Sequence, residues 1–227
     1  MQSTARTRMG REQIVKLPTA EQLESAAAAF ADDWGGVDEV LYGICRKYPG
    51  HAVHREVTAK AALIDRTYAA GLERQVQPAP GDQAMTAIAD FLVAHGAEVD
   101  EVIATLDAVT EPLDAPAMAR IVDGHGRLTT LLSKLTTSHS SPRSFAAKYL
   151  HFHRPVVPIY DSYAATRLVK LVRWQADEIP FAPPPSADAE YWSFCVRFMR
   201  LYDACRHAGI AVSVKSLDTY LWAVSAS

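Results

Sequence analysis

The sequence between residues 144 and 162 reads SFAAKYLHFHRPVVPIYDS. It begins with apolar and aromatic residues, continues through a segment that two prolines make stiff, and ends at an aspartate suited to starting a helix. Lys148 lies within the apolar part, and Asp161 stands where a helix N-cap is expected. The stretch therefore predicts two helices joined by a rigid connection, with one amine and one carboxylate that could act on a sugar carbon.

The rest of the chain has helical periodicity, and no alternation typical of strands continues for more than a few residues. Glycines, prolines and capping residues divide it into segments. The expected helices span residues 19–34, 37–48, 54–75, 83–94, 99–109, 118–135, 143–152, 162–174, 189–208 and 215–224. Gly35 and Gly36 are expected to end the first helix, and Gly124 and Gly126 to kink or break the sixth. The fold class that follows is all-α.

Length and composition limit the classes of protein that the chain can belong to. At 227 residues with 49% hydrophobic content, it can bury a core without disulfides, and we expect one domain over residues 1–227. Its three cysteines, Cys45, Cys195 and Cys205, form no CxxC spacing. No signal peptide and no run of about 18 apolar residues is present. We therefore expect a cytoplasmic protein that does not enter a membrane.

The positive charge is concentrated in one part of the chain. The formal net charge is −3, yet residues 120–174 contain nine basic and two acidic residues, a net of +7, so the remainder carries −10. Four histidines, His125, His139, His151 and His153, fall in the same window. This asymmetry is typical of a localised anion-binding face. Ordinary solvated helix charges without a common face are the alternative.

Lys148 and Asp161 suit the cleavage of an N-glycosidic bond. The sugar becomes cationic as that bond breaks, so a fixed carboxylate such as Asp161 would lower the barrier. An amine among apolar residues, such as Lys148, has a lowered pKa and could attack the sugar carbon to give a Schiff base. The alternatives are that Asp161 only caps a helix, and that Lys148 extends its amine to water or to a phosphate.

The polar turn before this stretch, residues 136–144, leads into a helix N-terminus, which attracts phosphate. Together, turn and stretch resemble the helix-hairpin-helix DNA glycosylase superfamily, in the lysine-and-aspartate form of the 8-oxoguanine enzymes. Lys148 matches the family's lysine, Pro158-Ile159 the run before the acid, and Asp161 the aspartate. The chain differs from the family at the hairpin, where Ser141-Pro142-Arg143-Ser144 replaces Gly-x-Gly, and after the acid, where Ser162 and Tyr163 follow.

The resemblance implies a two-lobed helical bundle with a helix-hairpin-helix element, whose hairpin and catalytic segment span about residues 120–174. It implies a monomeric DNA glycosylase that flips a base out of double-stranded DNA and leaves an abasic site, with possible lyase activity. The implied catalytic residues are Asp161 and Lys148. The residues expected to contact DNA are Ser141, Arg143, Ser144, His151, His153, Arg154 and Arg167. Those expected to line the base pocket are Asp65, Arg66, Tyr68 and Tyr160.

No cofactor or metal is expected. The C-terminus lacks the cysteine cluster of the iron–sulfur branch. His151 and His153 lie two residues apart, so on a helix they point to nearly opposite sides, and only an extended local chain would let them converge on a metal with Asp161. The target base could be oxidised or alkylated, as in base-excision repair, or a modified cytosine of phage DNA, as in anti-phage defence.

Two other classes of function remain open. One is a non-catalytic helical DNA-binding protein that keeps the hairpin. The other is a helical protein-interaction module without a nucleic-acid partner, whose binding would not weaken steeply with salt.

Overall fold

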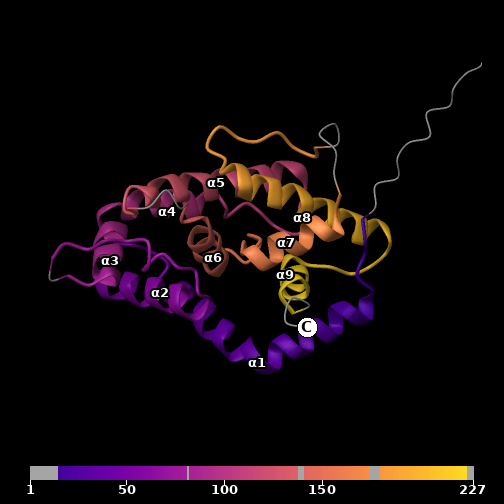
Figure 1. Ribbon diagram of the computed structural model, residues 1–227, viewed down its shortest axis with the longest axis horizontal. Coiled ribbons are helices and arrows are strands. Elements are labelled where there is room, and N and C mark those ends of the chain that lie inside the picture. Colours follow the sequence, from indigo (N-terminus) through magenta and orange to yellow (C-terminus); the bar gives the residue numbers. More distant parts are fainter. Residues whose placement is uncertain (1–14, 81, 138–140, 174–178, 224–227) are drawn as a thin grey trace, which may run out of the picture.

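The computed structural model describes residues 15–80, 82–137, 141–173 and 179–223. These residues form helices without strands, apart from two isolated bridges, Val15 with Val172 and Val76 with Thr136 (Figure 1). The helices are α1 (Ala20–Lys47), α2 (His54–Thr67), α3 (Ala84–Ala94), α4 (Gly96–Ala104), α5 (Ala115–Ser133), α6 (Arg143–His153), α7 (Ser162–Leu171), α8 (Ala189–His207) and α9 (Val214–Ala223). The expected all-α class is confirmed.

Side chains at the helix starts satisfy backbone N–H groups that have no partner within the helix. Thr19 and Gln22 form a capping box at the start of α1. Asp114, Asp161 and Asp188 accept hydrogen bonds from backbone N–H groups in the first turns of α5, α7 and α8. These caps explain why the expected starts of these helices agree with the structure within a few residues.

The helix end expected at Gly35 and Gly36 is wrong, and so is a break at Gly124 and Gly126. Helix α1 continues through Gly35 and Gly36, and α5 continues through Gly124 and Gly126. A glycine within a helix costs only about 1 kcal/mol relative to alanine. Buried side chains on both sides of these glycines, such as Leu23 and Leu41 in α1, outweigh that cost.

Other helices are shorter than expected. Helix α2 ends at Thr67, because both carboxylate oxygens of Asp65 accept backbone N–H groups of the next loop, from Leu72 at 2.8 Å and from Glu73 at 3.0 Å. Gly71 in this loop has a φ of 83°, a conformation that favours glycine. Helix α4 ends at Ala104 and α7 at Leu171. The expected end of the latter, residue 174, lies outside the described residues.

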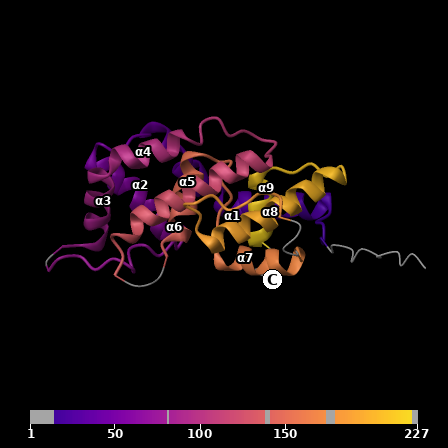
Figure 2. The same ribbon diagram turned by 90° about the horizontal axis from the view of Figure 1, so that it is seen from above.

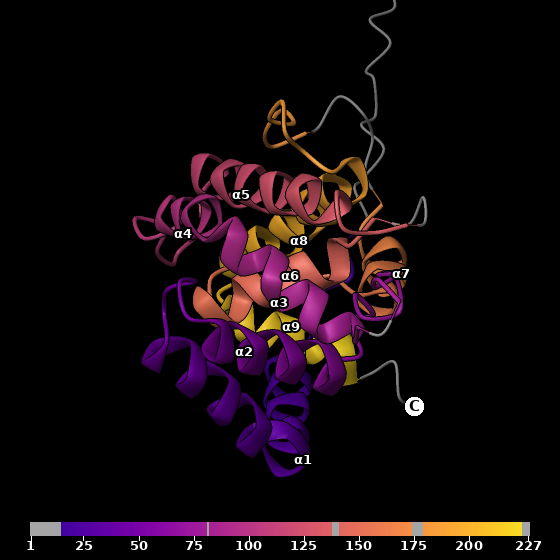
Figure 3. The ribbon, with the colours of Figure 1, turned by 90° about the vertical axis from the view of Figure 1, so that its left-hand side faces the viewer.

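Helix α6 lies at the centre of the molecule and contacts α1, α2 and α5. Its residues from Phe145 to His153 are all buried. Viewed from the side, α4 and α5 lie on one side of α6 and α1 on the other (Figure 3). Helix α1 packs along α9, and α7 lies against α8 and α9 (Figure 2). Buried on all sides, α6 can hold the Lys148 amine out of water.

The structure bears only in part on the expected hairpin and on the expectation that the protein does not enter a membrane. The centre of the expected hairpin, residues 138–140, lies outside the described residues, although α5 and α6 on either side of it pack together. Among the described helices, none is both long enough and apolar enough to cross a membrane.

Candidate active site

A pocket of about 180 Å³ brings Lys148 and Asp161 together. Its walls come from α1, from the end of α2 and the residues after it, from α6, from the start of α7 and from α9. Its aromatic side chains are Phe30, Trp34, Tyr68 and Trp222, and its ionisable ones include Lys148, Asp161, Lys215 and Asp218. A cavity of roughly 150 Å³ can hold a benzene ring. The pocket is therefore large enough for one aromatic ring.

Lys148 reaches the pocket from the buried helix α6 and is only 3% exposed. Its Nζ donates hydrogen bonds to the backbone oxygen of Tyr68 at 2.9 Å and to Oγ of Ser144 at 3.0 Å. A protonated lysine has three N–H donors, so one direction remains for a ligand. Burial lowers the pKa of this amine, while the charges of Asp161 and Asp65 raise it and oppose that shift. The neutral, nucleophilic form is thus more accessible than in an exposed lysine.

Asp161 is the N-cap of α7, and its Oδ1 accepts the N–H of Ala164 at 2.7 Å. Among the described residues, none donates a hydrogen bond to its Oδ2. The preceding loop is anchored by Asp218 on α9, whose two carboxyl oxygens lie 3.3 and 3.2 Å from the backbone nitrogen of Ile159. Burial raises the pKa of Asp218 well above its usual value, and the nearby Asp161 charge adds to this rise. The site thus holds one carboxyl group that favours its neutral form beside a partly exposed carboxylate.

The aromatic side chains of the pocket contact one another with their ring planes far from parallel. The Trp222 ring lies 5.7 Å from Trp34 and 5.8 Å from Phe30, both nearly perpendicular. Lys215 lies over Phe30 at 4.4 Å and pairs with Asp38, which also accepts the hydroxyl of Tyr68. These contacts fix the side chains that would surround a planar ligand.

Of the four residues expected in the base pocket, only Tyr68 lines it. Asp65 is buried beneath the loop after α2, and Arg66 forms an exposed pair with Glu73. Tyr160 points away, donates its hydroxyl to Glu190 and lies beneath the Arg143 guanidinium. Intramolecular hydrogen bonds hold these three side chains elsewhere, so they do not line this pocket.

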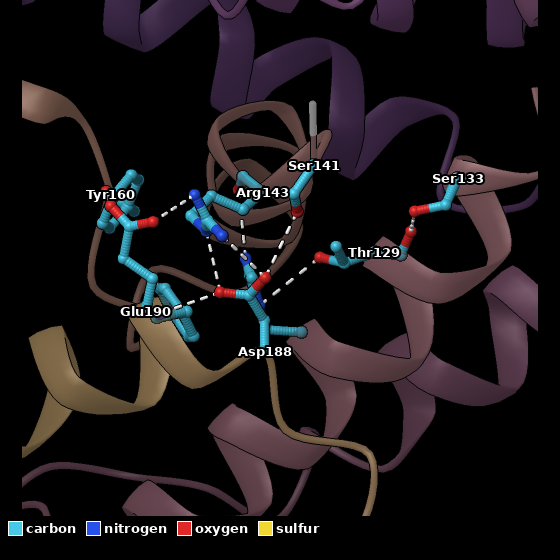
Figure 4. Close-up of polar contacts among 9 residues, drawn as sticks. Thr129, Ser133, Ser141, Arg143, Tyr160, Asp188 and Glu190 are labelled. Atoms are coloured by element: carbon cyan, nitrogen blue, oxygen red, sulfur yellow. Dashed lines mark hydrogen bonds and ion pairs between the residues drawn. The ribbon is translucent and has the colours of Figure 1, made fainter. Parts of the chain in front are cut away.

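The residues expected to grip DNA at the hairpin bond within the protein (Figure 4). Arg143 forms two hydrogen bonds to Asp188, at 2.7 and 3.0 Å, and an ion pair with Glu190 at 2.6 Å. Ser141 also donates to Asp188, at 3.2 Å. The hydroxyl oxygen of Ser144 accepts a hydrogen bond from the Lys148 amine. This cluster joins the start of α6 to the start of α8. The positive charge of Arg143 is compensated by the two carboxylates and is not free to bind a phosphate.

The two histidines of α6 are buried, contrary to the expectation that they contact DNA. His151 is fully buried, where its Nδ1 donates to the backbone oxygen of Val157 and its Nε2 accepts the hydroxyl of Tyr42. Burial lowers the pKa of His151 to about 3 and that of His153 well below the usual value. Both rings are therefore neutral near pH 7 and supply no charge to a phosphate.

The other two expected DNA contacts are also engaged. Arg154 pairs with Asp107, and the Arg167 guanidinium lies 4.6 Å from the ring centre of Tyr220. An arginine in an ion pair would have to leave its partner before it could bind a phosphate.

Sequence reasoning missed most of the pocket wall. Phe30 and Trp34 lie four residues apart on α1, and Lys215, Asp218 and Trp222 lie on one face of α9. The spacing shows that each set shares a helix face. It does not show that both faces meet α6, because that depends on helix packing.

In the described part of the chain, no group of three or more His, Cys, Asp or Glu side chains could hold a metal ion. Comparisons with known protein families, with curated proteins and with solved structures find no match to this chain. The function must therefore be argued from the pocket itself.

Proposed function

We propose that the protein is a DNA glycosylase, which flips one base out of duplex DNA and cleaves its N-glycosidic bond. The observation that carries this proposal is that Lys148 and Asp161 line one ring-sized pocket with aromatic walls. A glycosylase must hold the extruded base between aromatic or apolar side chains and needs charged groups beside the sugar. The pocket combines both requirements.

The carboxylate of Asp161 would stabilise the positive charge that develops on the sugar as the bond to the base breaks. Its cap bond to Ala164 fixes the group, and Oδ2 remains available to the substrate. The aromatic side chains would stack on the base, and the pocket volume admits one ring fully. In this arrangement the base enters the pocket and the sugar stays near its opening.

The neutral amine of Lys148 would attack C1′ of the sugar. The new N–C1′ bond forms as the bond to the base breaks, and the base leaves with the electron pair and takes up a proton. Loss of a proton from the nitrogen and opening of the sugar ring then give a Schiff base. Borohydride reduces such an imine to a stable amine, which joins the protein to the DNA.

The proposal also covers the helix-hairpin-helix element, the partner, the oligomeric state and the cellular role. Helices α5 and α6 with the segment between them would form the helix-hairpin-helix element of a two-lobed bundle, which their mutual packing supports. Double-stranded DNA would be the partner of a monomer in the cytoplasm. The reaction would serve repair or anti-phage defence against modified DNA.

The second candidate is a non-catalytic helical DNA-binding protein. One observation favours it: the Lys148 amine already bonds the Tyr68 backbone and Ser144, which is how a structural lysine is held. In that case Lys148 would only join α6 to the end of α2, and Asp161 would only cap α7.

One experiment separates the two candidates. The purified protein is incubated with duplexes that carry oxidised, alkylated or glucosylated bases, and abasic sites are then cleaved with alkali. We expect cleavage on at least one substrate and none with Asp161→Asn. Asparagine is also a good N-cap, so this variant keeps the cap of α7. Asp114→Asn, a change at the cap of α5, is the matched control and should cleave as the wild type does.

The same reactions with borohydride test Lys148. A trapped adduct that disappears in Lys148→Gln makes this lysine the nucleophile. Alkali cleavage without a trapped adduct makes water the nucleophile and Lys148 a positioning residue. No cleavage on any substrate, by the wild type or by Asp161→Asn, would contradict the glycosylase, and binding of the same duplexes would then support the non-catalytic alternative.

A further inference from the structure

The solvent-facing side of α7 carries an exposed aromatic residue beside the pocket. Tyr163 is 67% exposed, more than any other large hydrophobic side chain in the described residues. The next is Val40, at 58%. Tyr163 lies in the first turn of α7, between Asp161 and Ala164, and both of those residues line the pocket. A large aromatic side chain thus stands in water next to the proposed site of base extrusion.

Cations continue this face away from the pocket. Lys170 is seven residues after Tyr163, so it lies on the same side of the helix and about 10 Å along its axis. Arg173 follows just after the helix and is also exposed. Among the described residues, neither has an ion-pair partner, in contrast to Arg143 and Arg154.

A third cation comes from the N-terminal segment. The backbone N–H of Lys16 donates to the backbone oxygen of Leu171 at 2.9 Å, and Val15 pairs with Val172. This attaches the segment to the end of α7. Lys16, Lys170 and Arg173 then line one open hollow of about 600 Å³, whose described lining residues include no carboxylate. Three exposed cations with no carboxylate among the described residues that line the hollow form a surface that favours a polyanion.

We propose that duplex DNA lies along this face, which we define as Tyr163, Lys16, Lys170 and Arg173. The cations neutralise phosphates of one strand, and Tyr163 stacks against the bases next to the extruded nucleotide. Phosphates of one strand recur about every 3.4 Å along the axis of duplex DNA, so the rise of about 10 Å along α7 from Tyr163 to Lys170 covers about three nucleotides. The position of Tyr163 beside an extruded nucleotide rests on the proposed glycosylase function, whereas the phosphate contacts do not.

Binding to an inert duplex tests this surface without any chemistry. The probe is a fluorescent duplex with a central tetrahydrofuran abasic analogue, titrated with full-length protein at several salt concentrations. Each phosphate contact contributes about 0.9 to the slope of log K against log salt. We expect Lys16→Gln/Lys170→Gln/Arg173→Gln to reduce this slope by about 2.7. Lys47→Gln/Arg55→Gln/Arg120→Gln removes the same charge from exposed positions on α1, α2 and α5 and should leave it unchanged.

Tyr163→Ala should weaken binding roughly five- to 150-fold, the range that loss of one base–aromatic stack gives. Tyr163→Phe keeps the ring and should bind as the wild type does. Val40→Ala removes an exposed apolar side chain on α1 and should have no effect. All substitutions lie on the surface, so thermal melting should show unchanged folding.

The outcomes separate this inference from the proposed function. Equal slopes for the two triple variants would overturn the phosphate contacts, and wild-type affinity in Tyr163→Ala would overturn the stacking of Tyr163, even if excision occurs. An acidic polypeptide is titrated as a second ligand. If the triple variant Lys16→Gln/Lys170→Gln/Arg173→Gln loses as much affinity for this polypeptide as for the duplex, DNA is not the specific partner of this face. A reduced slope with no excision on any modified duplex would support the phosphate contacts while overturning the glycosylase.

Discussion

The Lys148 amine donates hydrogen bonds to two acceptors and is almost fully buried, and this combination sets its chemistry. Burial lowers its pKa below the ordinary value of 10.5, so the neutral fraction grows at lower pH than for an exposed lysine. We expect the rate of borohydride trapping to rise with pH, with a midpoint below 10.5. Single-turnover trapping between pH 6 and 10 measures it. A rate independent of pH throughout that range would argue against a lysine nucleophile.

Arg143 illustrates how a residue expected on the surface can serve stability. Its partner Asp188 is only 13% exposed, and that carboxylate also caps α8. Truncation of Arg143 leaves Asp188 without its ionic partner, which costs about 1–3 kcal/mol of unfolding free energy.

We therefore expect Arg143→Ala to shift the urea midpoint downwards, and Arg120→Ala, at an exposed position on α5, to leave it unchanged. A double-mutant cycle with Asp188→Asn should give a coupling energy of the same order. Additive effects of the two substitutions would contradict the pairing.

At the scale of elements, two glycines of α5 have opposite roles although they lie two residues apart. A Cβ on Gly126 would lie 2.0 Å from the backbone oxygen of Ser186, whereas one on Gly124 would make ordinary contacts, the nearest at 3.5 Å to Leu106. Gly126 thus permits the proline-rich loop before α8 to approach the helix backbone.

This difference gives a matched pair of substitutions. Gly126→Ala should destabilise the protein by about 1–3 kcal/mol, because the loop must move. Gly124→Ala should be neutral or stabilise it by up to about 1 kcal/mol, because alanine favours the helix. Chemical denaturation measures both. Similar effects from the two changes would show that the loop does not press on α5.

At the scale of the whole molecule, buried histidines make stability depend on pH. His51, His125, His151 and His153 are buried, and burial is the main cause that lowers their pKa values, to about 4 for His51 and His125 and about 3 for His151. The unfolded chain binds protons at these rings near pH 6.5, whereas the folded protein does not.

Because each folded-state pKa is lowered, this stability is present above pH 6.5 and decreases as the pH falls towards 4. The free energy of unfolding should fall by roughly 1.4 kcal/mol per histidine for each pH unit in this range. Urea denaturation at pH 7.5, 6, 5 and 4.5 measures it. His207→Gln, at an exposed position, should not change the dependence. Stability independent of pH would contradict neutral burial of the four rings.

The sequence alone was sufficient for the helical class and for most helix boundaries. Capping residues such as Thr19, Asp114 and Asp188 act locally, so their effect can be read from neighbouring residues. The helix breaks expected at glycines are wrong because they were inferred from neighbouring residues alone. Gly35 and Gly126 lower helix propensity locally, yet side-chain packing against distant helices decided that α1 and α5 continue.

The candidate site was predictable only where its residues lie close together in the chain. The sequence by itself placed Lys148 in an apolar helix and Asp161 at a helix start, because periodicity and capping are local properties. Only the tertiary structure decided that Trp34, Asp218 and Trp222 surround them, and that Arg143, His151 and Arg154 bind protein groups. Those outcomes depend on which helix faces meet, and that is set by packing of the whole core.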